Sequence, residues 1–210
     1  AGMLYTYESG PARDRFARFL KEKYRDDDRL AESWGPKVSF SAITSGLFDQ
    51  ALTDRGVADC EEFSAEMVSR FFTTLTQECR KIDPHHLNLG IRYQTVPPHW
   101  ALDGMRTFDV FSMNCYRDRV PSEVNAEIAR LLGMPVMIGE WHFGALDAGL
   151  PASGIGHVRS QTDRGKAYRY YLETAAADPN CVGVHYFTLY DQSAIGRFDG
   201  EAYQIGFIDG

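Results

Sequence analysis

The sequence predicts an α/β fold in which the strands of a parallel sheet alternate with helices. Apolar residues recur at three- and four-residue intervals over 61–82 and then alternate over 86–93, so a helix gives way to a strand near Asp83-Pro84. The run Val136-Met-Ile138 is short and entirely apolar, which is typical of a strand buried on both faces of a parallel sheet. Further strand-like and helical runs take turns along the chain, as parallel strands joined by helices require.

Three helices are predicted before the first strand. Residues 11–24 place an apolar stripe on one face, and a short helix over 26–34 stops at Gly35-Pro36. The longest helix covers 61–82, and its apolar face must pack against something large. That face comprises Phe63, Met67, Val68, Phe71, Phe72, Leu75, Cys79 and Ile82.

Four strands follow, and the residues at their ends favour a (β/α) barrel. The predicted strands cover 86–93, 108–114, 136–140 and 182–188, with helices near 122–132 and 163–177. Polar or aromatic residues end each strand, and no glycine-rich phosphate loop follows the first one, which argues against a doubly wound sheet. A complete (β/α)8 TIM barrel needs about 250 residues. We therefore expect residues 1–210 to form one partial TIM-barrel domain that holds roughly the second half, strands 5 to 8.

Composition excludes several partners. The chain has 210 residues, a formal net charge of −7 and 44% apolar residues, and its Lys and Arg residues form no cluster apart from Asp and Glu. No nucleic-acid or anionic membrane partner is expected, and no stretch approaches the roughly 20 apolar residues that span a bilayer. The four cysteines form no CxxC pair and are interpreted as free thiols. No cofactor is expected.

The predicted strand ends together resemble a carbohydrate site. Sugars stack their apolar faces on aromatic rings, while directional donors and acceptors bind their hydroxyl groups. A glycosidase also needs two carboxylates, one as nucleophile or base and one as acid, and Glu140 is the best first candidate. The residues expected at this edge are Arg92, Tyr93, Asn114, Tyr116, Glu140, Trp141, His142, His185, Tyr186, Tyr190 and Asp191.

Five segments carry a family resemblance. They are 19–24 through Trp34-Gly35, 83–93, 108–116, 138–144 and 200–206. With them the chain resembles the C-terminal half of a clan-A retaining glycoside hydrolase, most of all the β-agarases and related β-galactosidase-like enzymes.

The resemblance implies roles for particular residues of a TIM-barrel catalytic domain. It makes Glu140 the nucleophile at the end of strand seven and Tyr116 the strand-six residue that orients it. The family's pair of an arginine and an aromatic residue on strand five corresponds to Arg92 and Tyr93. Substrate binding is expected from Arg92, Tyr93, Asn114, Trp141, His142, His185 and Tyr186.

The acid/base residue departs from the family pattern. Clan-A enzymes place this Glu after an Asn at the end of strand four, and the sequence contains no Asn-Glu dipeptide. Glu8 is the only early candidate, but it lies closer to the Phe19-Leu20 motif than the family interval allows. We therefore expect the acid/base to lie outside this chain, and negligible turnover from the chain alone.

The predicted function is retaining, double-displacement hydrolysis of a β-linked galactan such as agarose, with an oligo- or polysaccharide as partner. One alternative is a carbohydrate-binding pseudoenzyme without the acid/base. Another is a metal-dependent TIM-barrel hydrolase that uses Glu140, His142, His185 and Asp191 as ligands. Action on an insoluble polymer favours export to the periplasm or the exterior, although the sequence shows no signal segment. The glycan, its linkage and the oligomeric state stay open at this point.

Overall fold

The computed structural model describes residues 2–5, 10–45, 48–150 and 152–208. These form two compact units, one of residues 1–73 with 99–104 and the other of residues 74–98 with 105–210. Glu8 lies outside the described residues. The expectation of one partial domain over 1–210 stays a prediction.

The first unit is helical. Its elements are η1 (Gly2–Tyr5), α1 (Pro11–Tyr24), α2 (Asp27–Trp34), α3 (Phe40–Ser45), most of α4 (Asp54–Ile82), and α5 (His99–Leu102). Proline stands at the first turn of α1, where its missing N–H costs nothing, and the Asp26 carboxylate accepts from the backbone N–H of Arg29 to cap α2. The predicted helices over 11–24 and 26–34 are confirmed, and the longest helix begins seven residues earlier than expected, at Asp54 rather than Glu61.

Asp59 is a buried charge in the core of this first unit. Its Oδ2 accepts hydrogen bonds from Tyr24 Oη at 2.5 Å and Trp34 Nε1 at 2.8 Å, and Lys23 Nζ lies 2.9 Å from Oδ1. Burial raises the pKa of the Asp59 carboxyl, but these three donors outweigh it and hold the pKa below its usual value. The carboxylate therefore stays ionised and ties α1, α2 and α4 together.

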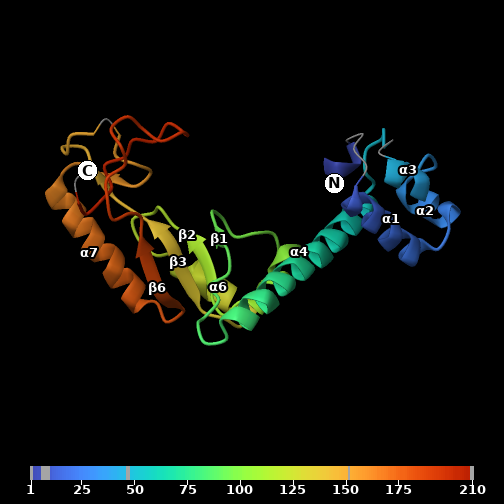
Figure 1. The fold of residues 1–210 in the computed structure, drawn as a ribbon, viewed down its shortest axis with the longest axis horizontal. Helices are drawn as coiled ribbons and strands as arrows, with labels where there is room; N and C mark the ends of the chain where they lie inside the picture. The colour runs from blue at the N-terminus through green and yellow to red at the C-terminus, as the bar shows by residue number, and fades with distance from the viewer. Residues whose placement is uncertain (1, 6–9, 46–47, 151, 209–210) are drawn as a thin grey trace. The chain divides into compact units, whose positions relative to one another are not determined.

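The second unit is built on a parallel sheet with strand order β1-β2-β3-β6 (Figure 1). Its elements are β1 (Arg92–Tyr93), η2 (Asp103–Thr107, in part), β2 (Phe111–Asn114), α6 (Ser122–Leu132), β3 (Val136–Trp141), β4 (Gly144–Ala145), β5 (His157–Val158), α7 (Gln161–Ala177) and β6 (Cys181–Tyr186). β4 and β5 form a separate two-stranded parallel sheet. This arrangement confirms the α/β class with a parallel sheet.

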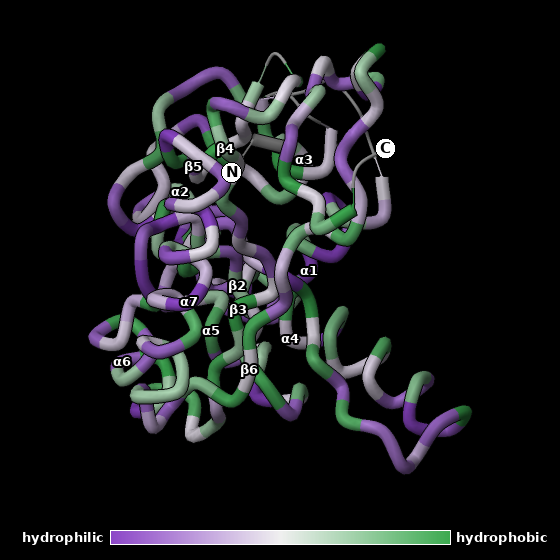
Figure 2. The backbone as a smooth tube through the Cα atoms, turned by 90° about the vertical axis from the view of Figure 1, so that its left-hand side faces the viewer, coloured by the Kyte–Doolittle hydropathy of each residue, from purple (hydrophilic) through white to green (hydrophobic). Residues whose placement is uncertain are grey.

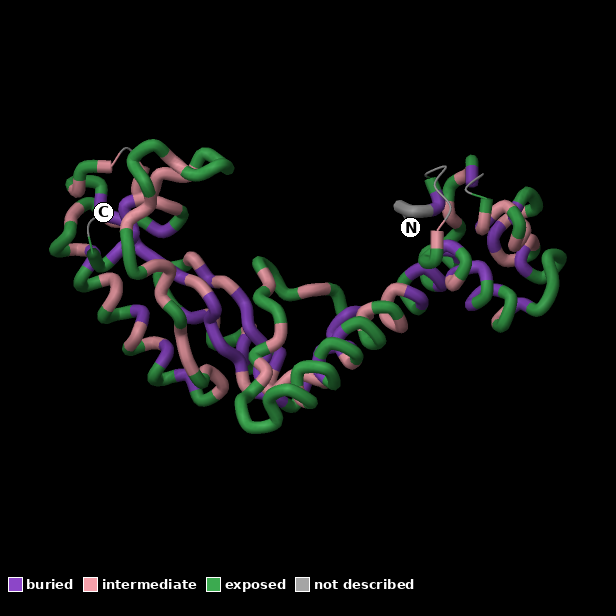
Figure 3. The backbone as a smooth tube through the Cα atoms, viewed as in Figure 1, coloured by how far each residue is buried: buried purple, intermediate pink, exposed green. Residues whose placement is uncertain are grey.

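β2 and β3 form the buried centre of the sheet (Figure 3). The hydrophobic run Val136–Ile138 belongs to β3, which is labelled in Figure 2, and it is buried as the sequence predicts. The register of β2 against β3 shifts between Met113 and Asn114, so that Asn114 pairs with Glu140. This shift brings two polar side chains opposite each other at the carboxyl end of the sheet.

The first predicted strand is much shorter in the structure. Only Arg92 and Tyr93 of residues 86–93 are in β1, and the alternating side chain of Leu87 is 69% exposed. The backbone N–H of Asn88 donates to Asp109 Oδ2 at 2.6 Å, while Asn88 Oδ1 accepts from the N–H of Gly90 at 2.9 Å. These bonds to side chains, one local and one to a residue 21 positions away, replace the ladder that a longer strand would form.

Candidate active site

Three donors converge on the carboxylate of Glu140, which lies near the end of β3. Oε1 lies 2.9 Å from Nη2 of Arg92 in β1. Oε2 accepts from Nδ2 of Asn114 at 2.8 Å and from Oη of Tyr116 at 2.5 Å, both at the end of β2. The Glu140 side chain is 15% exposed. The sheet thus holds one carboxylate in a single orientation at its carboxyl edge, where parallel α/β proteins place their ligands.

Gly139 makes the approach of Arg92 to Glu140 possible. A Cβ atom on Gly139 would stand 2.1 Å from Cδ of Arg92 and 2.7 Å from Oγ of Ser112. With hydrogen in that place, the Arg92 side chain extends from β1 over β2 to β3, where it donates to the carbonyl oxygen of Gly139 at 3.1 Å and reaches Glu140. The glycine is therefore part of the site, although the sequence alone did not predict a role for it.

The two tyrosines at this edge stay protonated for a physical reason. Burial, followed by the hydrogen bond to Glu140, raises the pKa of Tyr116 above its usual value, so its hydroxyl remains a donor to the carboxylate. Burial raises the pKa of Tyr93 to about 12. The Tyr93 ring stacks on Phe111 with the ring centroids 5.6 Å apart, and so one of its faces is already occupied.

Trp141 is a correction to the predicted sugar-binding set. Its side chain is 1% exposed and stacks on Tyr171 of α7 at 4.0 Å, with Tyr186 edge-on at 4.9 Å. The ring fills the space between β3 and α7 and is not available to a sugar. It belongs to the core that supports the strand of Glu140.

His142 is also buried, and it packs against Tyr116 of the site. It is 2% exposed, and its Nε2 accepts from the backbone N–H of Ile155 at 3.0 Å. Burial lowers the pKa of His142 to about 4, so the imidazole is neutral at physiological pH. Its ring lies 4.7 Å from that of Tyr116. His142 therefore packs against Tyr116 and holds the backbone at Ile155, and it is not a substrate contact.

His185 and Tyr186, both in β6, lie in different surroundings. His185 is exposed and lines a shallow hollow of the sheet with Arg92 and Gly139. The Tyr186 hydroxyl donates to the carbonyl oxygen of Phe143 at 3.1 Å and accepts from Arg164 at 3.2 Å, and this fixes the ring against α7. The structure thus brings His185, but not Tyr186, to the side of the sheet where Arg92 lies.

The predicted metal ligands do not converge. His142 accepts from Ile155, and Asp191 Oδ1 accepts from the N–H of Gly206 at 2.7 Å. Within the ranges that the structure describes, no group of three or more His, Cys, Asp or Glu side chains could hold a metal ion. In the same ranges, none of the helices has the length and hydrophobicity that a bilayer span requires.

Residues in the segment 199–208, for which the sequence predicted no role, contact the elements around the site. Gln204 is 2% exposed, and its Oε1 accepts from the N–H of Ala145 at 3.1 Å, which fastens this segment to β4. The Glu201 carboxylate accepts from Nε2 of Gln192 at 2.9 Å, within the same part of the chain. The Gly200–Gly206 motif was the available signal.

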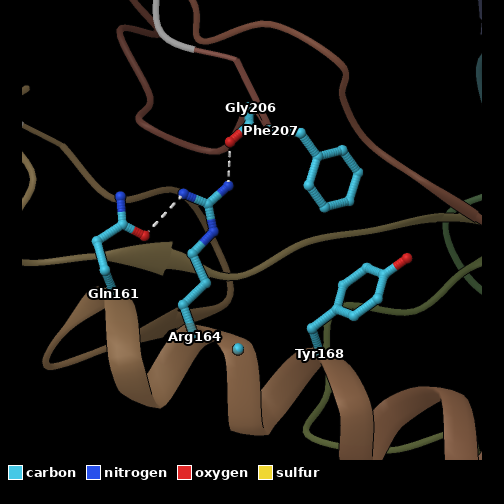
Figure 4. A pocket seen from close by; sticks show the side chains of 6 residues that line it. Gln161, Arg164, Tyr168, Gly206 and Phe207 are labelled. Atoms are coloured by element: carbon cyan, nitrogen blue, oxygen red, sulfur yellow. Dashed lines mark hydrogen bonds between the residues drawn. The ribbon is translucent and has the colours of Figure 1, made fainter.

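Arg164 of α7 holds the same segment from the other side. Its guanidinium donates to the carbonyl oxygen of Gly206 and to Oε1 of Gln161, the latter at 3.3 Å. Figure 4 shows this pair at a pocket that Tyr168 and Phe207 wall with their rings. The loops around Glu140 are thus anchored to α7 as well as to the sheet.

The chain is similar in sequence to two curated proteins. No protein-family model matches it. It is 35% identical over 98% of its length to β-agarase B, and 31% identical over 95% to β-agarase A, both of Vibrio sp. (strain JT0107). The chain spans only 22% and 21% of the lengths of these two curated relatives.

Solved structures agree with the sequence comparison. An agarase crystal structure matches 99% of this chain with a TM-score of 0.86 and 32% identity, and an exo-β-agarase matches 99% with 0.87 and 33%. The chain covers 30% and 29% of those two structures. A β-galactosidase from Halorubrum lacusprofundi shares the fold at a TM-score of 0.60 and 18% identity. The chain is therefore homologous to β-agarases.

Proposed function

We propose that the protein to which this chain belongs is a retaining glycoside hydrolase that cleaves a β-linked galactan of the agarose type, with Glu140 as its nucleophile. The observation that carries the proposal is the carboxylate of Glu140 held by Arg92, Asn114 and Tyr116 at the carboxyl edge of a parallel sheet. The homology to β-agarases supports the substrate class.

The proposed reaction has two displacements. One Glu140 carboxylate oxygen bonds to the anomeric carbon while the bond from that carbon to the leaving oxygen breaks, and an acid group protonates this oxygen. Water then attacks the same carbon, the acid group, now a base, takes its proton, and Glu140 departs as a carboxylate. Arg92, Asn114 and Tyr116 would stabilise the negative charge that returns to Glu140 when it departs in the second step. The anomeric configuration is retained.

The second carboxyl group would come from a region of the full-length protein that corresponds to the part of the β-agarases outside this match. Retention requires it about 5–5.5 Å from the nucleophile. We infer that β1, β2, β3 and β6 are strands 5 to 8 of a (β/α)8 TIM barrel, because β1 and β6 are the edge strands of this parallel sheet. A barrel would pair both edges and complete the walls of the site. The chain alone would then have negligible turnover.

The test is agarose hydrolysis by the full-length protein with Glu140→Ala. We expect a loss of at least ~10³-fold in kcat with unchanged folding. Added azide should then restore turnover and give the α-glycosyl azide, because an external anion replaces the missing nucleophile from its side of the sugar. Glu173→Gln, an exposed carboxylate of α7 that pairs with Arg169, is the matched control and should retain activity.

Other outcomes would reject the assignment. Undiminished activity in Glu140→Ala would remove Glu140 from the mechanism. Agarose binding without hydrolysis in the wild type would favour a carbohydrate-binding pseudoenzyme. A β-configured azide product would assign Glu140 to a role other than nucleophile.

A further inference from the structure

The loop from Gln192 to Glu201, here called the tip loop, exposes two large apolar side chains. Ile195 is 97% exposed and Phe198 is 98% exposed. Figure 1 shows this segment beyond the carboxyl ends of β3 and β6, and Figure 3 shows its tip as exposed. Burial of these two side chains against a ligand or a partner would remove apolar surface from water and is therefore favourable.

The tip is nevertheless an ordered turn. The N–H of Gly200 donates to the carbonyl oxygen of Arg197 at 2.9 Å, and the N–H of Arg197 donates to that of Glu201 at 2.7 Å. Gly200 has φ +86°, a conformation that other residues rarely adopt. The turn therefore presents Phe198 in a defined position, which lowers the entropy lost when a ligand binds.

The side chain of Arg197 leaves one face of the Phe198 ring open. The guanidinium carbon lies 5.8 Å from the ring centroid, over one face. The same guanidinium lies 2.7 Å from Asp199 Oδ2 and 3.2 Å from Glu201 Oε2. Arg197 is thus neutralised and held in place, and the opposite face of the ring is free for stacking.

The base of the tip loop borders the proposed active site. The N–H of Gln192 donates to the carbonyl oxygen of Tyr203 at 3.0 Å, and the Tyr203 ring lies 6.3 Å from that of His142. His142 in turn packs against Tyr116, which hydrogen-bonds Glu140. A polymer that extends from Glu140 along this side would meet the tip loop.

We propose that Phe198 is the platform of an outer sugar-binding subsite, on which one unit of an uncharged galactan stacks. This inference rests on the proposed function and adds a specificity to it. The tip loop contains one basic residue, Arg197, against Asp199 and Glu201, and Asp191 directly precedes it. Such a surface has no unpaired cation for a sulfate group and repels anions, so it selects the unsulfated polymer.

The test compares substrates of different length with the full-length protein. Phe198→Ala should raise KM for unsulfated agarose by about tenfold with little change in kcat, because one aromatic stacking contact is lost. The shortest agarose oligosaccharide that the wild type hydrolyses should be turned over as before. Phe198→Tyr should restore the polymer KM, and Tyr170→Ala, an exposed aromatic of α7, is the matched control.

A binding measurement separates this inference from the proposed function. Calorimetry would use the Glu140→Ala protein with and without Phe198→Ala. Adding Phe198→Ala should weaken the binding of a long unsulfated oligosaccharide about tenfold. The protein that keeps Phe198 should bind a sulfated oligosaccharide more weakly than the unsulfated one. An unchanged polymer KM and affinity would reject the subsite. Equal losses on long and short substrates with a lower Tm would mean that Phe198 packs against another part of the protein. If the wild type binds but hydrolyses no substrate, the proposed function fails while the binding result still decides the subsite.

Discussion

The hydroxyl of Tyr116 donates to Oε2 of Glu140 over 2.5 Å, and the two residues come from the ends of neighbouring parallel strands. Tyr116 rests in turn on the neutral ring of His142, 4.7 Å away. The hydroxyl that orients the carboxylate is therefore fixed by the core behind it.

Tyr116→Phe should lower kcat/KM on agarose about 10- to 100-fold. One hydrogen bond to a charged group contributes about 1.5–3 kcal/mol, and the phenylalanine ring keeps the packing against His142. Steady-state kinetics of the full-length protein would measure this. Tyr170→Phe removes an α7 hydroxyl and should leave kcat/KM unchanged, whereas wild-type kinetics in Tyr116→Phe would show that the bond is not used.

Gly139→Ala should lower activity at least ~10-fold, because the new methyl group displaces Arg92 from Glu140. Gly183→Ala is a matched control on β6, since a Cβ there meets only Cγ of Met137, at 3.9 Å. Both variants add one methyl group to a strand of the same sheet, and kcat/KM and Tm would be measured for both. Equal effects of the two would mean that the approach of Arg92 to Gly139 and Glu140 has no catalytic consequence.

His142 should make stability fall as the pH falls. Its folded pKa of about 4 lies below the ordinary 6.5, so its contribution is fully present above about pH 6.5 and is lost on acidification towards pH 4. The difference corresponds to about 3 kcal/mol. His142→Gln keeps an acceptor for Ile155 but does not titrate. Urea unfolding at pH 7.5 and pH 5 should show a smaller loss in this variant, and equal losses would contradict the assignment.

Asp59→Asn should destabilise the helical unit by about 1.5–3 kcal/mol, because Tyr24 and Trp34 lose the charged acceptor to which they donate. The folded pKa of Asp59 lies below its usual value, so its stabilisation is present above that usual value and is lost as the pH falls through the folded pKa. Glu62→Gln removes a more exposed partner of Lys23 and should cost under ~1 kcal/mol. Denaturant unfolding measures both, and similar losses would show that burial of Asp59 is unimportant.

Local pattern was sufficient to locate most elements. Proline at the start of α1 and the apolar stripe of α4 depend on neighbours within a few residues, and so does the apolar run that ends at Glu140. Residues 86–91 were predicted as strand because their apolar residues alternate. They are not strand because the backbone N–H of Asn88 donates to the side chain of Asp109, a residue distant in sequence.

The sequence by itself determined that a parallel α/β sheet presents Glu140, Asn114 and Tyr116 at one edge, since strand ends follow from hydrophobic runs and turns. Only the tertiary structure decided that Trp141 and His142 point into the core. Successive side chains of a strand face opposite sides, so Trp141 packs on Tyr171 of α7 while His142 packs on Tyr116. The register shift between Met113 and Asn114 places Asn114 opposite Glu140. That shift depends on contacts between residues far apart in the chain, which no local pattern records.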